Sequence, residues 1–168
     1  LFYSSLNEDM ISAGLLPRFL IIEYNGDRVP LNEGHVNVVP SFNLTDRLSS
    51  LIAHVETIMR ENRVINVGIE HDALSNLRSF DKSADTLINA THEDAIAELW
   101  NRAHMKVMRL SALIAVGVNP FHPVIENHHI EWAKALVQND IKTLSNRFER
   151  GEIGKNTSEN KQVKEVLR

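Results

Sequence analysis

Apolar residues recur at three- and four-residue steps along most of the chain after residue 44. Residues with this spacing share one side of an α-helix, whereas the residues of a strand alternate between two faces. The spacing predicts helices over about 44–62, 72–88, 93–116 and 127–148. Their expected inward residues are Leu44, Leu48, Leu51, Val55 and Ile58; Ala73, Leu77, Phe80, Ala84, Leu87 and Ile88; Ile96, Trp100, Ala103, Val107, Leu110 and Ile114; and Ile130, Ala133, Val137, Leu144 and Phe148. We therefore expect a mainly α fold, a helical bundle of about four principal helices.

One or two short strands are expected beside the helices. The apolar and aromatic runs Phe19–Tyr24 and Val64–Ile69 favour a pleated, buried conformation. Before the first run, Gly14 is suited to end a short helix, because glycine tolerates a positive φ. A single strand is not stable by itself, so Phe19–Tyr24 would have to pair with a sheet supplied from elsewhere. The segment 25–43 contains Gly and Pro among polar residues, which is the composition of a linker.

The composition excludes several classes of protein. No stretch of the 168 residues approaches the roughly 20 apolar residues that a membrane-spanning helix needs, so no membrane partner is expected. Cysteine is absent, which excludes disulfides and thiolate zinc sites and fits a cytoplasmic protein. The net charge of -4 gives no overall reason to bind a polyanion, so contact with nucleic acid would need a local basic patch. The chain begins with neither Met nor a secretory leader, and we expect it to be a piece of a longer protein.

Two motifs suggest chemistry but lack the spacing that the chemistry requires. The segment GEIGKNT (151–157) looks like a phosphate-binding loop, but the required first glycine would fall at Glu149 and the residue after the lysine is Asn156. A helix end followed by a polar tail is the better interpretation. His128 and His129 are adjacent, so on a helix they point about 100° apart and are not expected to bind one metal ion together. We expect no metal site.

Arg18 is the cation with the strongest indication of a function. It stands between the apolar residues Leu15–Pro17 and the expected strand that begins at Phe19. A guanidinium beside a buried strand is costly unless it reaches an anion, and its planar fork suits phosphate. The alternative is an ordinary ion pair with a nearby carboxylate, for which the candidates are Glu8, Asp9 and Glu23.

The last part of the chain is locally basic. Residues 142–168 contain seven Lys or Arg and four Glu. If this region contacts DNA, Lys142, Arg147, Arg150 and Lys155 should lie on one face, and the affinity should fall steeply with salt. The alternative is a helix end and tail whose charges are simply solvated.

Three segments, taken in order, resemble the C-terminal part of a family of phage, plasmid and mobile-element proteins. The segments are NEDMISAGLLPRFLIIEYNGDRVPLNE (7–33), ELWNRAHMKVMRLSALIAVGVNPFHPVI (98–125) and HIEWAKALV (129–137). The family consists of primase-helicase-like proteins and replicative helicases, many of them known only as a domain of unknown function. The resemblance covers most of the chain, and the phrase GLL-x-RF is its most specific motif.

The resemblance implies an arrangement of domains and a role for Arg18. In such proteins a P-loop ATPase core precedes this region, so residues 1–35 would be the C-terminal edge of that core, with Phe19–Tyr24 a remnant of its sheet. Residues 36–154 would form a helical domain and 155–168 a polar tail. Arg18 would contact nucleotide phosphate, within its own subunit or as an arginine finger offered to a neighbour in a ring. Arg28 would lie in the same neighbourhood.

The chain has no phosphate loop and no acidic metal-binding strand, so it is not expected to be catalytic alone or to hold a cofactor. The resemblance implies ATP and magnesium for the longer protein, single-stranded DNA as its substrate, and a homo-oligomeric ring or a replication partner. Two alternatives remain. One is a non-enzymatic protein–protein interaction module, which a large exposed apolar patch on the 44–58 or 128–148 helix would favour. The other is a helical DNA-binding domain.

Overall fold

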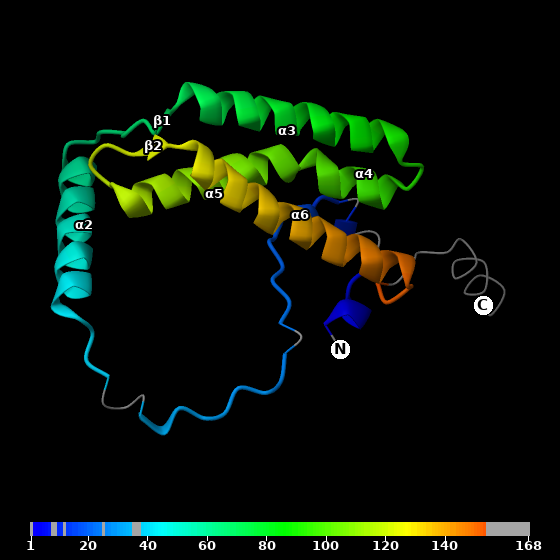
Figure 1. The fold of residues 1–168 in the computed structure, drawn as a ribbon, viewed down its shortest axis with the longest axis horizontal. Coiled ribbons are helices and arrows are strands. Elements are labelled where there is room, and N and C mark those ends of the chain that lie inside the picture. Colours follow the sequence, from blue (N-terminus) through cyan, green and yellow to red (C-terminus); the bar gives the residue numbers. More distant parts are fainter. Residues whose placement is uncertain (1, 8–9, 12, 25, 35–37, 154–168) are drawn as a thin grey trace, which may run out of the picture.

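The computed structural model describes residues 2–7, 10–11, 13–24, 26–34 and 38–153, and these residues form a mainly helical fold (Figure 1). In chain order the elements are η1 (Tyr3–Ser5), η2 (Leu16–Arg18), α2 (Phe42–Arg60), β1 (Gly68–Ile69), α3 (His71–Ala90), α4 (Asp94–Asn101), α5 (Ala103–Val118), β2 (Val124–Ile125) and α6 (Asn127–Glu149). Four of these helices are long, with 16 to 23 residues each, which confirms the expected mainly α fold with about four principal helices. Among the described residues, no helix is both long and apolar enough to cross a membrane.

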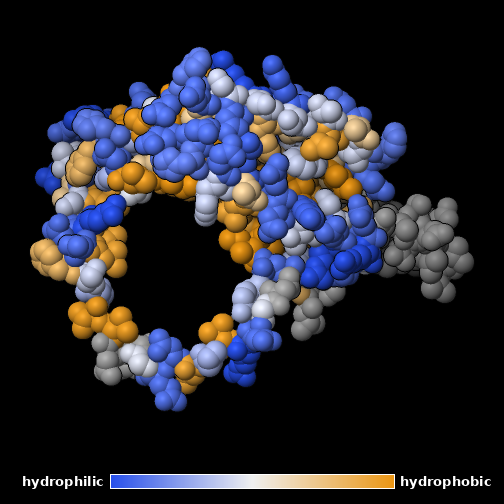
Figure 2. Space-filling model, viewed as in Figure 1, coloured by the Kyte–Doolittle hydropathy of each residue, from blue (hydrophilic) through white to orange (hydrophobic). Residues whose placement is uncertain are grey.

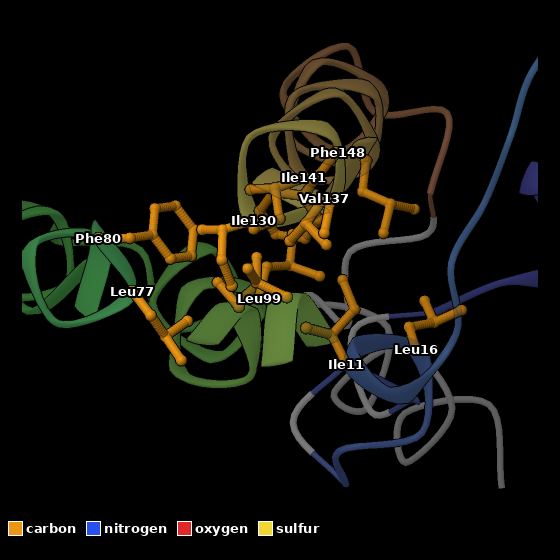
Figure 3. Packing of buried hydrophobic residues seen from close by; sticks show 14 of the residues in the cluster. Ile11, Leu16, Leu77, Phe80, Leu99, Ile130, Val137, Ile141 and Phe148 are labelled. Carbon is orange, nitrogen blue, oxygen red and sulfur yellow. The ribbon is translucent and has the colours of Figure 1, made fainter. Parts of the chain in front are cut away.

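The hydrophobic core lies between α3, α4, α5 and α6 (Figure 3). Its side chains come from all four helices and also from the N-terminal segment. They include Leu77 and Phe80 of α3, Leu99 of α4, Val107 of α5, Ile130, Val137, Ile141, Leu144 and Phe148 of α6, and Leu6, Ile11 and Leu16. Fully burying one large apolar side chain contributes about 1.5–3 kcal/mol to folding. The N-terminal segment is therefore held to the helices by the core that also holds the helices together.

Helix α6 contacts α3, α4 and α5, and its sequence pattern is confirmed in full. All five of its expected inward residues are buried. A capping box closes its first turn: the backbone N–H of Glu126 donates to His129 Nδ1 at 3.1 Å, and the Glu126 side chain accepts from the backbone N–H of His129. One member of the adjacent histidine pair is thus a buried capping residue, while the side chain of His128 is exposed.

The expected single helix over 93–116 is wrong, because the chain bends at Arg102 between α4 and α5. Arg102 has φ -99° and ψ -4°, and its backbone N–H donates to the carbonyl of Trp100. The buried row consists of Ala95, Leu99, Ala103, Val107, Ser111 and Ala115, which confirms Ala103 and Val107 but replaces the other four predicted residues by their neighbours in sequence. Most of these side chains are small, which lets α5 approach α6 closely. The larger residues of the predicted row, such as Leu110 and Trp100, are only partly buried.

Helix α2 departs most from expectation. It begins and ends two residues before the predicted bounds and has an N-cap, since Ser41 Oγ accepts from the backbone N–H of Leu44 at 3.3 Å, but none of its 19 residues is buried. Figure 1 shows α2 standing apart from the other helices, at the end of an extended connector. It contacts the end of α5 and the loop beyond: Arg47 Nη2 donates to the carbonyl of Gly117 at 3.1 Å, and the rings of His54 and Phe121 lie 4.5 Å apart. The expectation that its apolar stripe is core is therefore wrong: Leu44, Leu48 and Val55 are exposed, and Leu51 and Ile58 are only partly buried.

The expected strand Phe19–Tyr24 is also wrong. The described residues of this stretch have no ladder partner, and Phe19, Ile22 and Tyr24 are exposed. The backbone N–H of Ile21 donates instead to the carboxylate of Asp140 in α6. Nothing in the described part of the chain supports a remnant of an ATPase sheet here.

The second expected strand is present but short. β1 pairs with β2 in parallel, with Gly68 opposite Val124 and Ile69 opposite Ile125. The prediction for Val64–Ile69 is thus confirmed at its C-terminal end. This pair brings the beginnings of α3 and α6 close together, since β1 comes just before α3 and β2 just before α6.

Candidate functional site

An open cleft of about 300 Å³ lies between η2 and the N-terminal half of α5. It is lined by Pro17, Arg18, Leu20, Arg102, Met105, Lys106, Arg109 and Leu110. We call it the cationic cleft, because four of these eight residues are positively charged. Arg102, Lys106 and Arg109 follow at steps of four and three residues, which places them on one side of the helix. Arg18 faces them from η2, where the buried Pro17 anchors the turn.

The cleft is held open by a buried carboxylate. Asp140 is fully buried, and its Oδ2 accepts a hydrogen bond from Lys106 Nζ at 2.6 Å, while its Oδ1 accepts from the backbone N–H of Ile21 at 2.9 Å. The Lys106 side chain is only 9% exposed, so its charge is balanced locally. A buried pair of this kind is strongly destabilised when one partner is removed. Asp140 therefore fixes the N-terminal segment against α5 and α6, and with it the position of Arg18.

The other three cations have no acidic partner among the described residues. Arg18, Arg102 and Arg109 are exposed, and none of the ion pairs within the described ranges includes them. The alternative ion pair between Arg18 and Glu23 is not formed, because Glu23 binds Arg147. Its other two candidates, Glu8 and Asp9, lie outside the described residues. The N-terminus of α5 adds partial positive charge at Arg102, which lacks a capping side chain.

Gly14 lies beside the guanidinium of Arg18, and its positive φ, rather than a lack of space, favours glycine there. It has a φ of +73°, as the sequence predicted for a helix end, and its N–H donates to the carbonyl of Ile11 at 2.8 Å. A Cβ at this position would lie 3.8 Å from the guanidinium carbon of Arg18. The guanidinium of Arg18 therefore lies within van der Waals distance of position 14, at the edge of the residues that line the cleft.

The C-terminal basic residues are brought together in a second cleft of about 270 Å³. Lys142, Arg147 and Arg150 line it with Glu23, Asn139, Thr143 and Asn146, whereas Lys155 lies outside the described residues. Arg147 binds the carboxylates of Glu23 and Glu152 and lies 4.6 Å from the centre of the Tyr3 ring. The hydrogen bond to Glu152 raises the pKa of Arg147 above its ordinary value. Its donors are therefore engaged in holding the N-terminal segment to the end of α6.

Arg28 is exposed in the connector and lines neither cleft, so the structure does not bring it together with Arg18. Within the described ranges, no three His, Asp or Glu side chains are placed to hold a metal ion. Sequence reasoning found Arg18 but missed Arg102, Lys106 and Arg109. Their four- and three-residue spacing on a predicted helix indicated that they share one side of that helix. The sequence did not indicate which other element lies opposite that side.

A second surface feature is the apolar row of α2, which consists of Leu44, Leu48, Ile52, Val55 and Met59. All five side chains are exposed. Figure 2 shows hydrophobic side chains gathered over α2 and along the connector, beside the more hydrophilic surface of the other helices. The row runs along most of the helix, so a partner that covered it would have to be elongated.

Comparisons with protein-family models, with curated proteins and with solved structures found no significant match to this chain.

Proposed function

We propose that this chain is the C-terminal helical region of an ATP-dependent replicative DNA helicase or primase-helicase of a mobile element, in which Arg18 contacts nucleotide phosphate. One observation carries the proposal: Arg18 is one of the residues that line an open cationic cleft, and it has no acidic partner among the described residues. The resemblance of the GLL-x-RF phrase supports it. In this proposal the chain is not catalytic alone, and the longer protein supplies the phosphate loop and the magnesium ion.

The proposed role of Arg18 follows from its chemistry. Phosphoryl transfer spreads negative charge over the oxygens of the transferred group, and a positioned guanidinium stabilises that charge with two parallel hydrogen bonds. Arg102 and Arg109 raise the positive potential around the same point, and their effect is strengthened by the apolar walls of the cleft. Lys106 has a positioning role, since its ammonium group is held by Asp140. ATP and magnesium would reach Arg18 from the same subunit or from a neighbour in a ring.

The test is the ATPase activity of the longer protein with Arg18→Ala. An arginine finger contributes about 10³–10⁵ to turnover, so we expect a fall of that order. Arg78→Ala, which removes an exposed arginine of α3 outside the cleft, is the matched control and should leave turnover unchanged. Unchanged turnover in Arg18→Ala would remove the proposed role.

The exposed apolar row of α2 favours a second candidate function, a protein–protein interaction module of a replication protein. An uncovered apolar stripe on a helix marks a surface that binds another helix or groove. Under this proposal, Leu48→Asp combined with Ile52→Asp should abolish association with the replication partner in a reconstituted assembly. The control is Asp46→Asn, which lies on α2 but outside the row. Association that survives the double substitution would contradict this candidate.

A further inference from the structure

We infer that the cationic cleft is a polyphosphate-binding site that this chain forms by itself, with Arg102 and Arg109 joining Arg18 as ligand-binding residues. The inference builds on the proposed role of Arg18, and it adds that the phosphate site needs no residue from another domain. The shared ligand chemistry is a chain of linked phosphates, either inorganic or carried by a nucleoside.

The geometry of two elements supports a convergent site. Arg102 and Arg109 are seven residues apart on α5, which corresponds to about two helical turns on one side of the helix. Arg18 lines the same cleft of about 300 Å³ from η2, on the opposite wall. Both walls are fixed to each other through the buried Asp140, which binds Lys106 of α5 and the backbone of Ile21. The three guanidiniums are thus presented by a preorganised frame, which lowers the cost of binding.

The charge of the cleft matches several linked phosphates better than one. Asp140 neutralises Lys106, so three positive charges remain that have no acidic partner among the described residues, those of Arg18, Arg102 and Arg109. A single phosphate group carries about -1.5 to -2 charge at pH 7 and would leave part of this charge unpaired. Two or three linked phosphates balance it. Each guanidinium can then bind a different phosphate group through its fork of donors.

The walls of the cleft favour a compact ligand over a polynucleotide strand. Pro17, Leu20, Met105 and Leu110 make the rest of the lining apolar, which strengthens ion pairs inside and offers a surface to an organic group. Binding a nucleic acid strand requires a positively charged groove that follows the backbone. In the second cleft, Arg147 is already paired with Glu23 and Glu152, so its charge is balanced within the protein and is less available to a strand.

The experiment is isothermal titration calorimetry of the 168-residue chain with three probes: inorganic tripolyphosphate, ATP without magnesium, and an oligothymidylate. We expect tripolyphosphate and ATP to bind. Arg102→Ala and Arg109→Ala should each weaken binding of tripolyphosphate roughly tenfold or more, because each removes a charge-assisted hydrogen bond. Arg102→Lys should fall between the parent and Arg102→Ala, since it keeps the charge and loses the fork. Arg78→Ala is the control and should bind as the parent does.

Thermal unfolding of each variant, followed by circular dichroism, verifies that the variant is folded. If an alanine variant is not folded, the affinity of Arg102→Lys is used for the test instead. ATP that binds more tightly than tripolyphosphate identifies a nucleoside-bearing ligand that uses the apolar wall; equal affinities identify the phosphate chain alone. The inference is overturned if tripolyphosphate does not bind, if Arg78→Ala loses as much affinity as the cleft variants, or if only the oligothymidylate binds.

These outcomes are separable from those of the proposed function. Binding of tripolyphosphate by the chain, together with unchanged turnover of the longer protein carrying Arg18→Ala, would keep the site and reject the motor role. Loss of turnover without binding by the chain would keep the motor role and reject the self-contained site.

Discussion

Helices α2 and α6 have similar sequence patterns but differ in how much of each helix is buried. Both are long, and both carry large apolar residues at helical spacing. Eight residues of α6 are buried and none of α2 is. The difference comes from their neighbours: α6 packs against α3, α4 and α5, whereas α2 follows an extended connector and borders the end of α5, the loop beyond it and the residues before β1 on one side. Spacing therefore determines which side of a helix is apolar, and the connections on either side determine whether anything covers it.

The comparison also separates two sources of stability. The free energy of unfolding should depend on α6 and on the residues that α6 holds. Helix α2 should depend on its own capping and on any partner, because most helical stability in proteins comes from tertiary packing and α2 has no buried residue. Four measurements can break or refine this contrast.

The largest effect is expected for Asp140→Asn in α6. Without the carboxylate charge, Lys106 becomes a buried, uncompensated cation, and the free energy of unfolding should fall by about 3–5 kcal/mol. Asp46→Asn on α2 is the matched control, because Asp46 is exposed, and it should change stability by less than about 0.5 kcal/mol. Urea unfolding measures both. If the two substitutions lower the free energy of unfolding equally, the ion pair between Asp140 and Lys106 does not stabilise the fold.

A pair of leucine truncations gives the next largest difference. Leu144 of α6 is completely buried, so Leu144→Ala should cost about 2–5 kcal/mol through lost burial and the cavity left behind. Leu48 of α2 is about half exposed, and Leu48→Ala should cost less than about 0.5 kcal/mol. If Leu48→Ala costs as much as Leu144→Ala, α2 is covered in solution and the contrast between the helices fails.

The capping residue of α2 provides a local measurement. Ser41 Oγ accepts from the Leu44 N–H, and Ser41→Ala should destabilise α2 by about 1 kcal/mol. Because α2 is expected to open independently of the core, its amide protons should exchange about fivefold faster, while those of α6 stay unchanged. Native-state hydrogen exchange followed by NMR distinguishes the two helices. Faster exchange in both would show that α2 and α6 unfold as one unit.

The smallest effect concerns Tyr3, which packs under Arg147 at the end of α6. Burial, and next the charge of Glu23, raise the pKa of Tyr3 above its ordinary value of 10.0. The neutral phenol is thus favoured in the folded state, so its contribution to stability is present below about pH 10 and is lost as the pH rises through the folded-state pKa. Tyrosinate absorbance in a Tyr24→Phe background, which leaves Tyr3 alone, measures it. Glu23→Gln should lower the pKa of Tyr3. An unchanged pKa would contradict the interaction between the charge of Glu23 and the Tyr3 phenol.

Much of the fold could be predicted from residue spacing. The mainly α class, the bounds of α2, the buried face of α6 and the positive φ of Gly14 all follow from local patterns. The bend at Arg102 could not be predicted, because no Gly or Pro marks it in the sequence. The strand at Phe19–Tyr24 failed for a related reason, since a carboxylate more than a hundred residues away takes the Ile21 N–H.

The site was only partly predictable. Arg18 stood out because its neighbours in sequence are apolar. Arg102 and Arg109 can be recognised as part of a site only when the position of η2 beside them is known. That position depends on the contact between Asp140 and Ile21. The importance of a charged residue on an exposed helix face is set by what the tertiary structure puts opposite it.

The connector has a consequence for handling the protein. Its described residues 26–34 and 38–41 are all exposed, whereas the segment before it is attached to the helical core by Leu6, Ile11, Leu16, the Asp140 carboxylate and Arg147. A protease that cuts between 26 and 34 should therefore leave two fragments that migrate together under native conditions and separate only in denaturant. The arginine of η2 and the arginines of α5 could then be supplied on separate polypeptides, as a split protein whose reassembly restores the cleft.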